Sequence, residues 1–577
     1  MIYPEKKIRT IGLVTEDAFT DFPKEILHSV VHSVMDRKDI RIVVITGRSD
    51  DSNDPDDKMH QYKNVYNEIY NINGMCPFDG LLFTVPIFSE ARKKMFGDIP
   101  KVFIASDRKD ETTVNYDDEM GIREAIDYLV RIKGFTKICM IGGREDNADA
   151  RKRRAIFIKL LEENGIRFEE NMYEKSDMTT ASHRAAAALL NRNPDVEAIF
   201  CVNDQTASGL YDVMLERGLT PGRDITVFGF DNTSMGADMV PPLASIGTDG
   251  ETLGQKALEM LLAKMNGEEV SSQTVPTRLF DRGSFDYSAH DYFPAEMLTT
   301  DSKFIYRFFD KCFYRYRNEI INNRDIDLKR LFYEIFSKMI GAVRNRYMSE
   351  EEFNEIKKLI DIMFENGVMK YTDANRFVNS TVRIQNSMNR IQKSGFVDQK
   401  INALFSYMRD KAILAQAFSR NMEINGQNSR RDKLFDFTIH STNFGEPLEE
   451  SMDSMIKNIS RLGFNNSALF LYDEPVITRG DDTQILPDKI YMKCVVRDGE
   501  LFITPEDRQE CPIADIYNRG ELPQEKMGYV TYPLFYGEYL FGILLCGLSR
   551  TIIETGEFLT AQIGRTIYIN RIKDSEA

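Results

Sequence analysis

The stretch AIFCVNDQTASGLYDVMLERGLTPGRDITVFGFDN, residues 198–232, decides the fold of the N-terminal half of this chain. It opens with the apolar run AIFCVN, continues through an amphipathic segment and closes with a second apolar run, ITVFGFD. Runs that are apolar throughout, rather than alternating, are typical of parallel strands covered on both faces. A strand, a helix and a second strand in this order predict a βαβ unit.

The same alternation extends from residue 8 to about residue 290. Earlier apolar runs are separated by amphipathic stretches: IGLVT from Ile11, RIVVITG from Arg41, DGLLFT from Asp79, KVFIA from Lys101 and KICMIGG from Lys137. One amphipathic stretch reaches Gly165, a residue that suits the end of a helix. We therefore predict an α/β domain over residues 1–290.

Polar residues follow several of these runs, where open α/β sheets bind their ligands. They are Thr15 to Asp17, Asn203 with Asp204, and Asp231 with Asn232. Asn and Asp are also favoured as caps and turn residues, so any one of them alone is better explained as a cap. Together, at successive strand ends, they favour a ligand site.

Three segments resemble a known family. FCVNDQTASGLYDVMLERGLTPGRDITVFGFDN from Phe200, VNYDDEMGIREAIDYLVRIKGFTKICMIGG from Val114 and PPLASIGTDGETLGQKALEMLL from Pro241 resemble the ligand-binding domain of lactose/galactose-type repressors. The resemblance covers about residues 8 to 290 in the family's order. It implies a periplasmic-binding-protein-like type I domain, whose two lobes close on a small ligand.

The resemblance also implies ligand-binding residues. Arg153, in RRAIF, takes the place of the family's arginine; Asn203 is the asparagine of its Asn-Asp pair, and Asp231 is the aspartate after Gly-Phe. In the family these residues bind ligand hydroxyl or carboxylate groups. A forked donor, a donor and acceptor amide, and an acceptor suit that role.

Other positions match the family less closely. Phe22 falls where the family often places an aromatic residue, whereas Met178 stands where relatives often have one that stacks on a sugar or purine ring. Ile156 replaces a glycine, and Glu16 with Asp17 makes the first loop acidic. We add Phe22, Asp17 and Met178 to the predicted ligand-binding residues. The ligand expected is a sugar-like or other polar metabolite, and the acids favour a cationic or hydroxyl-rich one.

Residues 300–445 change to helical periodicity. Leu328, Leu331 and Ile335 lie on one apolar stripe, and Ser349 with Glu352 forms a capping-box pattern at the start of a further helix. The apolar heptads are short, which favours a helical bundle with a dimer contact over a long coiled coil. We predict an α-helical signalling and dimerisation region.

Residues 446–577 return to an α+β pattern. A helix, LEESMDSMIKNISRL, leads to the strand SALFLYD from Ser467, and GYVTYPLFYGEYLFGILLCGL from Gly528 precedes a last helix. The pattern resembles the end of a GAF domain. A sensor domain, helices and a GAF-like domain in this order resemble the sensor halves of some diguanylate cyclases, although the glycine-glycine-acidic-acidic-phenylalanine signature of a cyclase is absent.

Composition limits the partners. A net charge of −16 argues against a surface that binds nucleic acid broadly, and no helix-turn-helix precedes the first strand, so direct DNA binding is not expected. The sequence has no apolar stretch long enough to span a membrane and no signal-peptide pattern, which predicts a cytoplasmic protein. Seven scattered cysteines and six dispersed histidines predict neither a metal site nor a cofactor.

No phosphate loop, zinc-protease motif or nucleophile elbow occurs, so we expect no catalytic residues and no enzyme. The leading interpretation is a homodimeric ligand-sensing regulatory protein. It would relay small-molecule binding through the helices and the GAF-like domain to an output domain or partner. Two alternatives stay open: a transcriptional regulator whose DNA binding is supplied elsewhere, and the sensory part of a diguanylate cyclase.

Overall fold

The computed structural model describes most of the chain. The described residues are 8–16, 21–35, 37–48, 58–84, 90–248, 252–285, 302–313, 316, 327–372, 374–391, 399–418, 431–432, 464–478, 485–522 and 528–576. Contacts divide the chain into two units. Unit 1 comprises Met1–Phe285 with Arg430–Ala577, and unit 2 is Asp286–Ser429.

The first lobe of unit 1 is a parallel sheet built from the predicted apolar runs. Its strands are β1 (Arg9–Glu16), β2 (Ile40–Gly47), β3 (Gly80–Phe83), β4 (Lys101–Ile104) and β5 (Thr113–Asp117), in the spatial order β2-β1-β3-β4-β5. Its helices are α1 (Asp21–Val34), α2 (Lys58–Tyr66), α3 (Glu68–Gly74), α4 (Glu90–Met95) and α10 (Leu253–Met265). Only the two end residues of β1 are partly exposed, as expected for a strand covered on both faces.

The second lobe repeats this arrangement. Its strands are β6 (Ile138–Gly142), β7 (Tyr173–Lys175), β8 (Ala198–Cys201), β9 (Thr226–Phe230) and β10 (Ala244–Thr248), in the order β7-β6-β8-β9-β10. Its helices are α5 (Asp118–Asp127), continued by a π-helical turn (Tyr128–Ile132), α6 (Ala148–Glu163), α7 (His183–Arg192), α8 (Asp204–Glu216) and α9 (Ser234–Asp238). The predicted helix end is confirmed, since Gly165, with a φ of 78°, follows the C-cap of α6.

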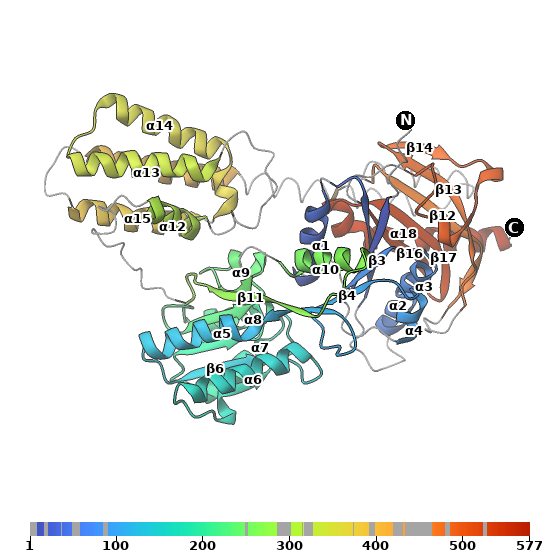
Figure 1. The fold of residues 1–577 in the computed structure, drawn as a ribbon, viewed down its shortest axis with the longest axis horizontal. Coiled ribbons are helices and arrows are strands. Elements are labelled where there is room, and N and C mark those ends of the chain that lie inside the picture. The colour runs from blue at the N-terminus through green and yellow to red at the C-terminus, as the bar shows by residue number, and fades with distance from the viewer. Residues whose placement is uncertain are drawn as a thin grey trace. The chain divides into compact units, whose positions relative to one another are not determined.

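Strand β11 (Gln273–Phe280) belongs to both lobes (Figure 1). Its first residues pair with β5 in the first lobe, and Thr277–Phe280 pair with β10 in the second. The chain also crosses where β5 leads into α5, and again between β10 and α10. Crossing segments of this kind join two lobes that can rotate against each other, which confirms the predicted two-lobed α/β architecture.

The C-terminal part of unit 1 is mainly antiparallel. Its elements are β12 (Ser467–Ile477), β13 (Lys489–Arg497), β14 (Glu500–Ile503), β15 (Glu510–Pro512), β16 (Gly528–Tyr536), β17 (Tyr539–Gly547) and α18 (Arg550–Glu576). The strands expected from Ser467 and Gly528 are therefore present. The helix expected over 448–462 lies outside the described residues.

This C-terminal sheet is continuous with the sheet of the first lobe, which the sequence did not predict. Strand β16 pairs in parallel with β2, from Gly528 opposite Ile42 to Thr531 opposite Ile45. Gly528 has a φ of 129°, and a β-carbon there would lie 2.0 Å from the carbonyl oxygen of Ile42. Only glycine fits this close approach. Residues expected to form a separate third domain thus belong to the same unit as the first lobe.

Buried polar contacts reinforce this junction. Asn73 donates to the Thr531 hydroxyl at 3.3 Å and accepts from the Tyr517 hydroxyl. The Thr478 hydroxyl donates to the carboxylate of Glu68 at 2.6 Å. Glu68 and Asn73 are fully buried. Because unpaired polar groups are costly in such surroundings, these bonds hold the two sheets in one register.

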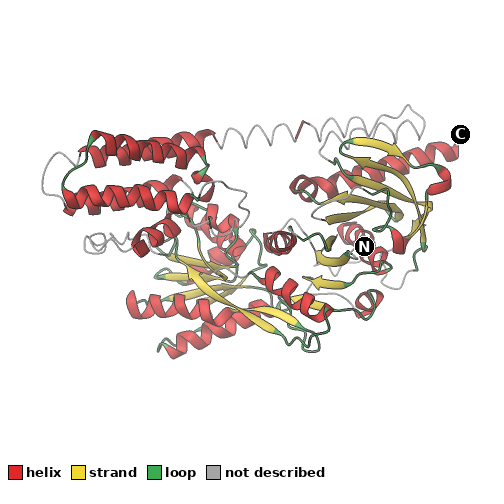
Figure 2. Ribbon diagram, turned by 45° about the horizontal axis from the view of Figure 1, so that its top comes forward, coloured by secondary structure: helices red, strands yellow, loops and turns green. Residues whose placement is uncertain are grey.

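The described residues of unit 2 are mainly helical. They form α12 (Ser302–Cys312), α13 (Leu328–Asn345), α14 (Glu350–Glu365), α15 (Ala374–Ile391) and helical residues 399–418, and helices are drawn in red in Figure 2. Helix α13 packs against both α12 and α14. The predicted stripe of Leu328, Leu331 and Ile335 is buried. The capping box is confirmed: Ser349 accepts from the amide of Glu352 at 3.0 Å, and the Glu352 carboxylate accepts from the amide of Ser349 at 2.9 Å.

Among the helices of the described residues, none is both long and apolar enough to cross a bilayer. This finding covers the helices of both units.

The junction can be tested with Tyr517→Phe. The variant keeps the ring but leaves the buried carboxamide oxygen of Asn73 without its donor. We expect the free energy of unfolding to fall by about 1–3 kcal/mol in a urea titration. Tyr491→Phe, which changes a partly exposed tyrosine of β13, is the control and should leave stability almost unchanged.

Candidate ligand-binding site

Arg153 lies at the centre of the candidate site. It projects from α6 and is 3% exposed. Its Nη1 donates to the carbonyl of Val202 at 2.8 Å, and its Nε donates to Asp118 at 3.2 Å. Its Nη2 donates to Asp231 at 3.3 Å, and the guanidinium carbon lies 3.6 Å from the centre of the Phe230 ring. The structure therefore brings together the two charged residues that the resemblance predicted.

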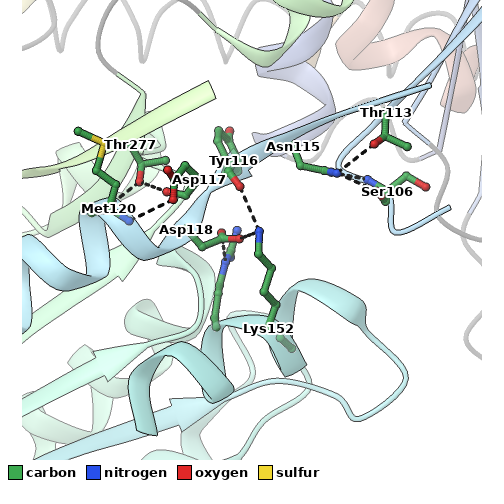
Figure 3. Close-up of polar contacts among 12 residues, drawn as sticks. Ser106, Thr113, Asn115, Tyr116, Asp117, Asp118, Met120, Lys152 and Thr277 are labelled. Atoms are coloured by element: carbon green, nitrogen blue, oxygen red, sulfur yellow. Dashed lines mark hydrogen bonds and ion pairs between the residues drawn. The ribbon is translucent and has the colours of Figure 1, made fainter. Parts of the chain in front are cut away.

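Further charges surround this guanidinium. Lys152 donates from Nζ to the buried carboxylate of Asp118 at 2.5 Å and to the carbonyl of Tyr116 at 3.1 Å, at the end of crossing strand β5 (Figure 3). Asp149 lies one helical turn before Arg153. We call Arg153, Lys152, Asp118, Asp149 and Asp231 the Arg153 cluster. It contains three carboxylates and two cations.

Burial and charge act in opposite directions within the cluster. Burial lowers the pKa of Arg153, but Asp231 and Asp118 outweigh it and raise that pKa above its ordinary value. Burial raises the pKa of Asp149, which the Arg153 guanidinium opposes. Arg153 therefore stays charged, and the surrounding carboxylates stabilise it.

Asn203 acts as a helix cap, which was the alternative to ligand binding for the polar residues at strand ends. Its side-chain oxygen accepts from the amide of Thr206 at 2.9 Å, which makes it the N-cap of α8. Its amide nitrogen donates to the carbonyl of Met178 at 3.0 Å. The structure thus joins Asn203 to a second predicted site residue. A ligand contact by either residue stays a prediction.

Asp231 stands in an unusual turn. It has a φ of 92°, and the next residue, Asn232, has a φ of 52°. Non-glycine residues in this region cost on the order of 1–3 kcal/mol each and persist where surrounding contacts impose them. The amide of Asp231 donates to the carbonyl of Ile246 and that of Asn232 to the hydroxyl of Ser245, both at 2.9 Å. These bonds fix the turn against β10.

Asp204, next to Asn203, faces the protein core. It is fully buried and accepts from the Ser245 hydroxyl at 2.6 Å, the Thr233 amide at 2.7 Å and the Thr233 hydroxyl at 2.9 Å. Burial raises its pKa to about 7, although the Ser245 hydrogen bond opposes the shift. Asp204 therefore connects the loop after β8 with the loop after β9.

Phe22 marks the first-lobe side of the candidate site. Its ring lies edge-on to Tyr116 with the centroids 6.5 Å apart, and Tyr116 lies 5.6 Å from Phe230 of the second lobe. An aromatic series thus runs from α1 through the crossing strand to β9. Asp17 lies outside the described residues.

Sequence reasoning missed three members of the Arg153 cluster. Asp118 and Asp149 each stand in the first turn of a helix, where acids are common for helix-dipole reasons alone, so neither was distinctive. Lys152 stands in the basic run RKRR, a pattern that more often marks a solvated helix face. The pair of aspartates after VNY was the available signal for Asp118.

The described residues contain no group of three or more His, Cys, Asp or Glu side chains arranged to hold a metal ion. All seven cysteines are buried. Burial raises the pKa of Cys201 and that of Cys546. These thiols are therefore poor metal ligands and nucleophiles.

Asp204 makes the stability of unit 1 depend on pH. Its pKa is raised in the folded state, so between about pH 4 and pH 7 the folded state binds more protons than the unfolded state. Its contribution to the free energy of unfolding is therefore greatest at low pH and is lost as the pH rises through 7. In thermal melts recorded between pH 5 and pH 8, the Tm should fall less with rising pH for Asp204→Asn than for the wild type. The control is Asp195→Asn, which removes an exposed acid of the same lobe; an equal decrease in all three proteins would contradict the assignment.

Comparison with known proteins identifies part of this domain. Residues 126–285 match the family model described as periplasmic binding protein-like domain. The lactose operon repressor of Escherichia coli K12 is 30% identical over 211 residues, which cover 35% of this chain and 57% of that protein. The transcriptional repressor PurR of Erwinia tasmaniensis is 31% identical over 224 residues, 37% of this chain and 65% of that protein.

A third relative, the transcriptional repressor CytR of Escherichia coli K12, is 29% identical over 175 residues, 30% of this chain and 51% of that protein. Among solved structures, a lac repressor dimer bound to operator and the anti-inducer ONPF has 24% identity and a TM-score of 0.41, covering 49% of this chain and 96% of that one. The chain spans between half and two thirds of the length of these curated relatives. It contains a periplasmic-binding-protein-like domain whose curated relatives are transcriptional repressors.

Proposed function

We propose that this chain is a non-catalytic regulatory protein that binds a small polar metabolite at the Arg153 cluster. The observation that carries the proposal is the buried guanidinium of Arg153, bonded to Asp118 and Asp231 at the carboxyl ends of strands. Open α/β sheets bind ligands at that edge. Arg153 is joined there to residues at the start of α5 and the ends of β8 and β9, so a ligand at the cluster would contact several segments at once.

The charges of the cluster suggest the ligand class. Its carboxylates outnumber its cations, and Asp118 already accepts from both Arg153 and Lys152. Asp149 and Asp231 both keep partly exposed side chains, so the donors of a ligand can approach their carboxylates. A ligand that presents hydroxyl or ammonium donors fits this surplus of acceptors, whereas an anionic ligand would be repelled.

The second candidate is control of transcription. The curated relatives that match this domain are named as transcriptional repressors, which favours this output over the others. DNA binding would then come from another chain or another segment. A gel-shift titration with genomic fragments at two salt concentrations tests this candidate, because phosphate contacts weaken steeply as salt rises. A sensory role ahead of a diguanylate cyclase remains the third candidate.

The relay of ligand binding is also proposed. The C-terminal sheet continues the sheet of the first lobe through β16 and β2, so the two move together. The helical unit and the C-terminal sheet, whose sequence resembles the end of a GAF domain, would carry the signal to an output partner. The absence of phosphate-loop and nucleophile motifs from the sequence supports a non-catalytic role.

A thermal-shift screen over lactose, cellobiose, other sugars, polyols, amino acids and purines identifies the ligand, since a compound that binds only the folded state raises the Tm. We expect Asp231→Ala to weaken binding of the strongest hit by roughly ten- to hundredfold, because the ligand loses a buried acceptor. Asp195→Ala, which removes an exposed acid of the same lobe, is the control. Wild-type affinity in Asp231→Ala would contradict the site.

Two further variants sharpen this experiment. The sequence contains no tryptophan, so Met178→Trp supplies a single fluorescent reporter beside Asn203. Arg153→Lys should lower both affinity and thermal stability, because lysine cannot reproduce the three hydrogen bonds of a buried guanidinium. Asp231→Ala also removes a partner of the buried guanidinium, so a thermal melt of each variant accompanies the binding measurement.

Assembly gives a separate prediction. We expect a homodimer, because the family associates through its lobes and the helices and C-terminal sheet offer further apolar surface. Ile413, Leu414 and Phe418 of the helical unit are exposed. Light scattering at micromolar concentration should give about twice the chain mass of 66.5 kDa. A mass equal to one chain would contradict the prediction.

A further inference from the structure

Arg282 lies two residues after the end of β11 and is 5% exposed. Its Nη2 donates to the side-chain oxygen of Asn232 at 2.5 Å, and its Nη1 donates to the carbonyl of Leu243 at 2.8 Å. One side chain therefore joins the turn after β9 to the segment that enters β10. Only a guanidinium offers two donors with this fixed spacing.

We propose that Arg282 is a positioning residue of the ligand site, which holds the Asp231–Asn232 turn in its left-handed conformation. The inference rests on the proposed function in that Asp231 is taken as a ligand-binding residue. Arg282 acts on Asp231 through Asn232, and it is Asp231 that contacts Arg153.

The turn needs external support, because two successive residues other than glycine have positive φ. Asn232 is held at two points, by Arg282 through its side chain and by the Ser245 hydroxyl through its amide. Opposite it stands Gly247, where a β-carbon would lie 2.4 Å from the β-carbon of Asn232. Glycine at position 247 therefore leaves the space that the Asn232 side chain occupies in this conformation.

A continuous series of buried hydrogen bonds extends this effect to the loop after β8. Ser245, which accepts from the amide of Asn232, donates its own hydroxyl to Asp204 at 2.6 Å. Asp204 directly follows Asn203. Arg282, Asn232, Ser245 and Asp204 thus connect the two loops that carry the predicted ligand residues, and all four are buried. Hydrogen bonds in such buried surroundings restrict the geometry of the loops that they join.

The alternative is that Arg282 merely fills the core of the second lobe. A glycine rescue distinguishes the two, since glycine adopts positive φ without steric cost. The variants are Arg282→Met, Asn232→Gly and the double variant. Arg278→Met is the matched control, because it removes a nearby guanidinium of β11, which lies over the Phe280 ring at 4.4 Å.

The first readout is hydrogen exchange of the Asp231, Asn232 and Thr233 amides in the full chain. Arg282→Met should raise their exchange rates by about tenfold or more relative to the strands of the second lobe. The exchange rates of the double variant should lie within about threefold of those of the Asn232→Gly variant. Arg278→Met should leave the exchange rates of these amides unchanged. The second readout is a crystal structure of Arg282→Met, in which Asp231 should leave positive φ and lose its contact with Arg153.

A uniform rise in exchange over the second lobe, or no rescue by Asn232→Gly, would overturn the proposal. If Arg282→Met does not fold, Arg282→Lys replaces it, and the same local rise is then required. The measurements need no ligand. A failed ligand screen would count against the proposed function and leave this result standing, whereas an unchanged turn in Arg282→Met would overturn the positioning role alone.

Discussion

The neutralisation of one buried cation governs the geometry of the second lobe. A guanidinium that is 3% exposed must have its charge balanced and its N–H groups paired. Arg153 meets both needs with the carboxylates of Asp118 and Asp231 and the carbonyl of Val202. These partners come from the start of α5 and the ends of β8 and β9. Three segments far apart in sequence therefore meet at one point.

Asp118 gives this arrangement its link to the crossing segment. It directly follows β5, the strand that joins the lobes, and the adjacent residue Asp117 caps α5 by accepting from the amide of Met120 at 3.3 Å (Figure 3). Asp117 also accepts through its carbonyl from the Thr277 hydroxyl of β11 at 2.5 Å. Both crossing strands are therefore bonded within one residue of a member of the Arg153 cluster. A change in the charge of the cluster would therefore act next to the segments that join the two lobes.

The elements that could be predicted from the sequence are those whose residue pattern lies within a short stretch of the chain. The apolar runs around Val43 and Phe228 became buried parallel strands, and Arg153 and Asp231 came together as the family resemblance implied. The pairing of β16 with β2 could not be predicted, because the partners lie far apart in sequence and neither strand carries a mark of the other. Asp118 and Asp204 could not be distinguished from helix-start residues, since their roles arise only from what folding places around them.

The pairing of β16 with β2 also makes unit 1 discontinuous in sequence. The first part of unit 1 ends at Phe285, whose ring packs against Phe228 with the centroids 5.7 Å apart, and unit 1 resumes at Arg430. The helical unit is therefore an insertion in the sequence of unit 1. Because β16 begins only at Gly528, the edge of the first-lobe sheet at β2 can be completed only after nearly the whole chain has been synthesised.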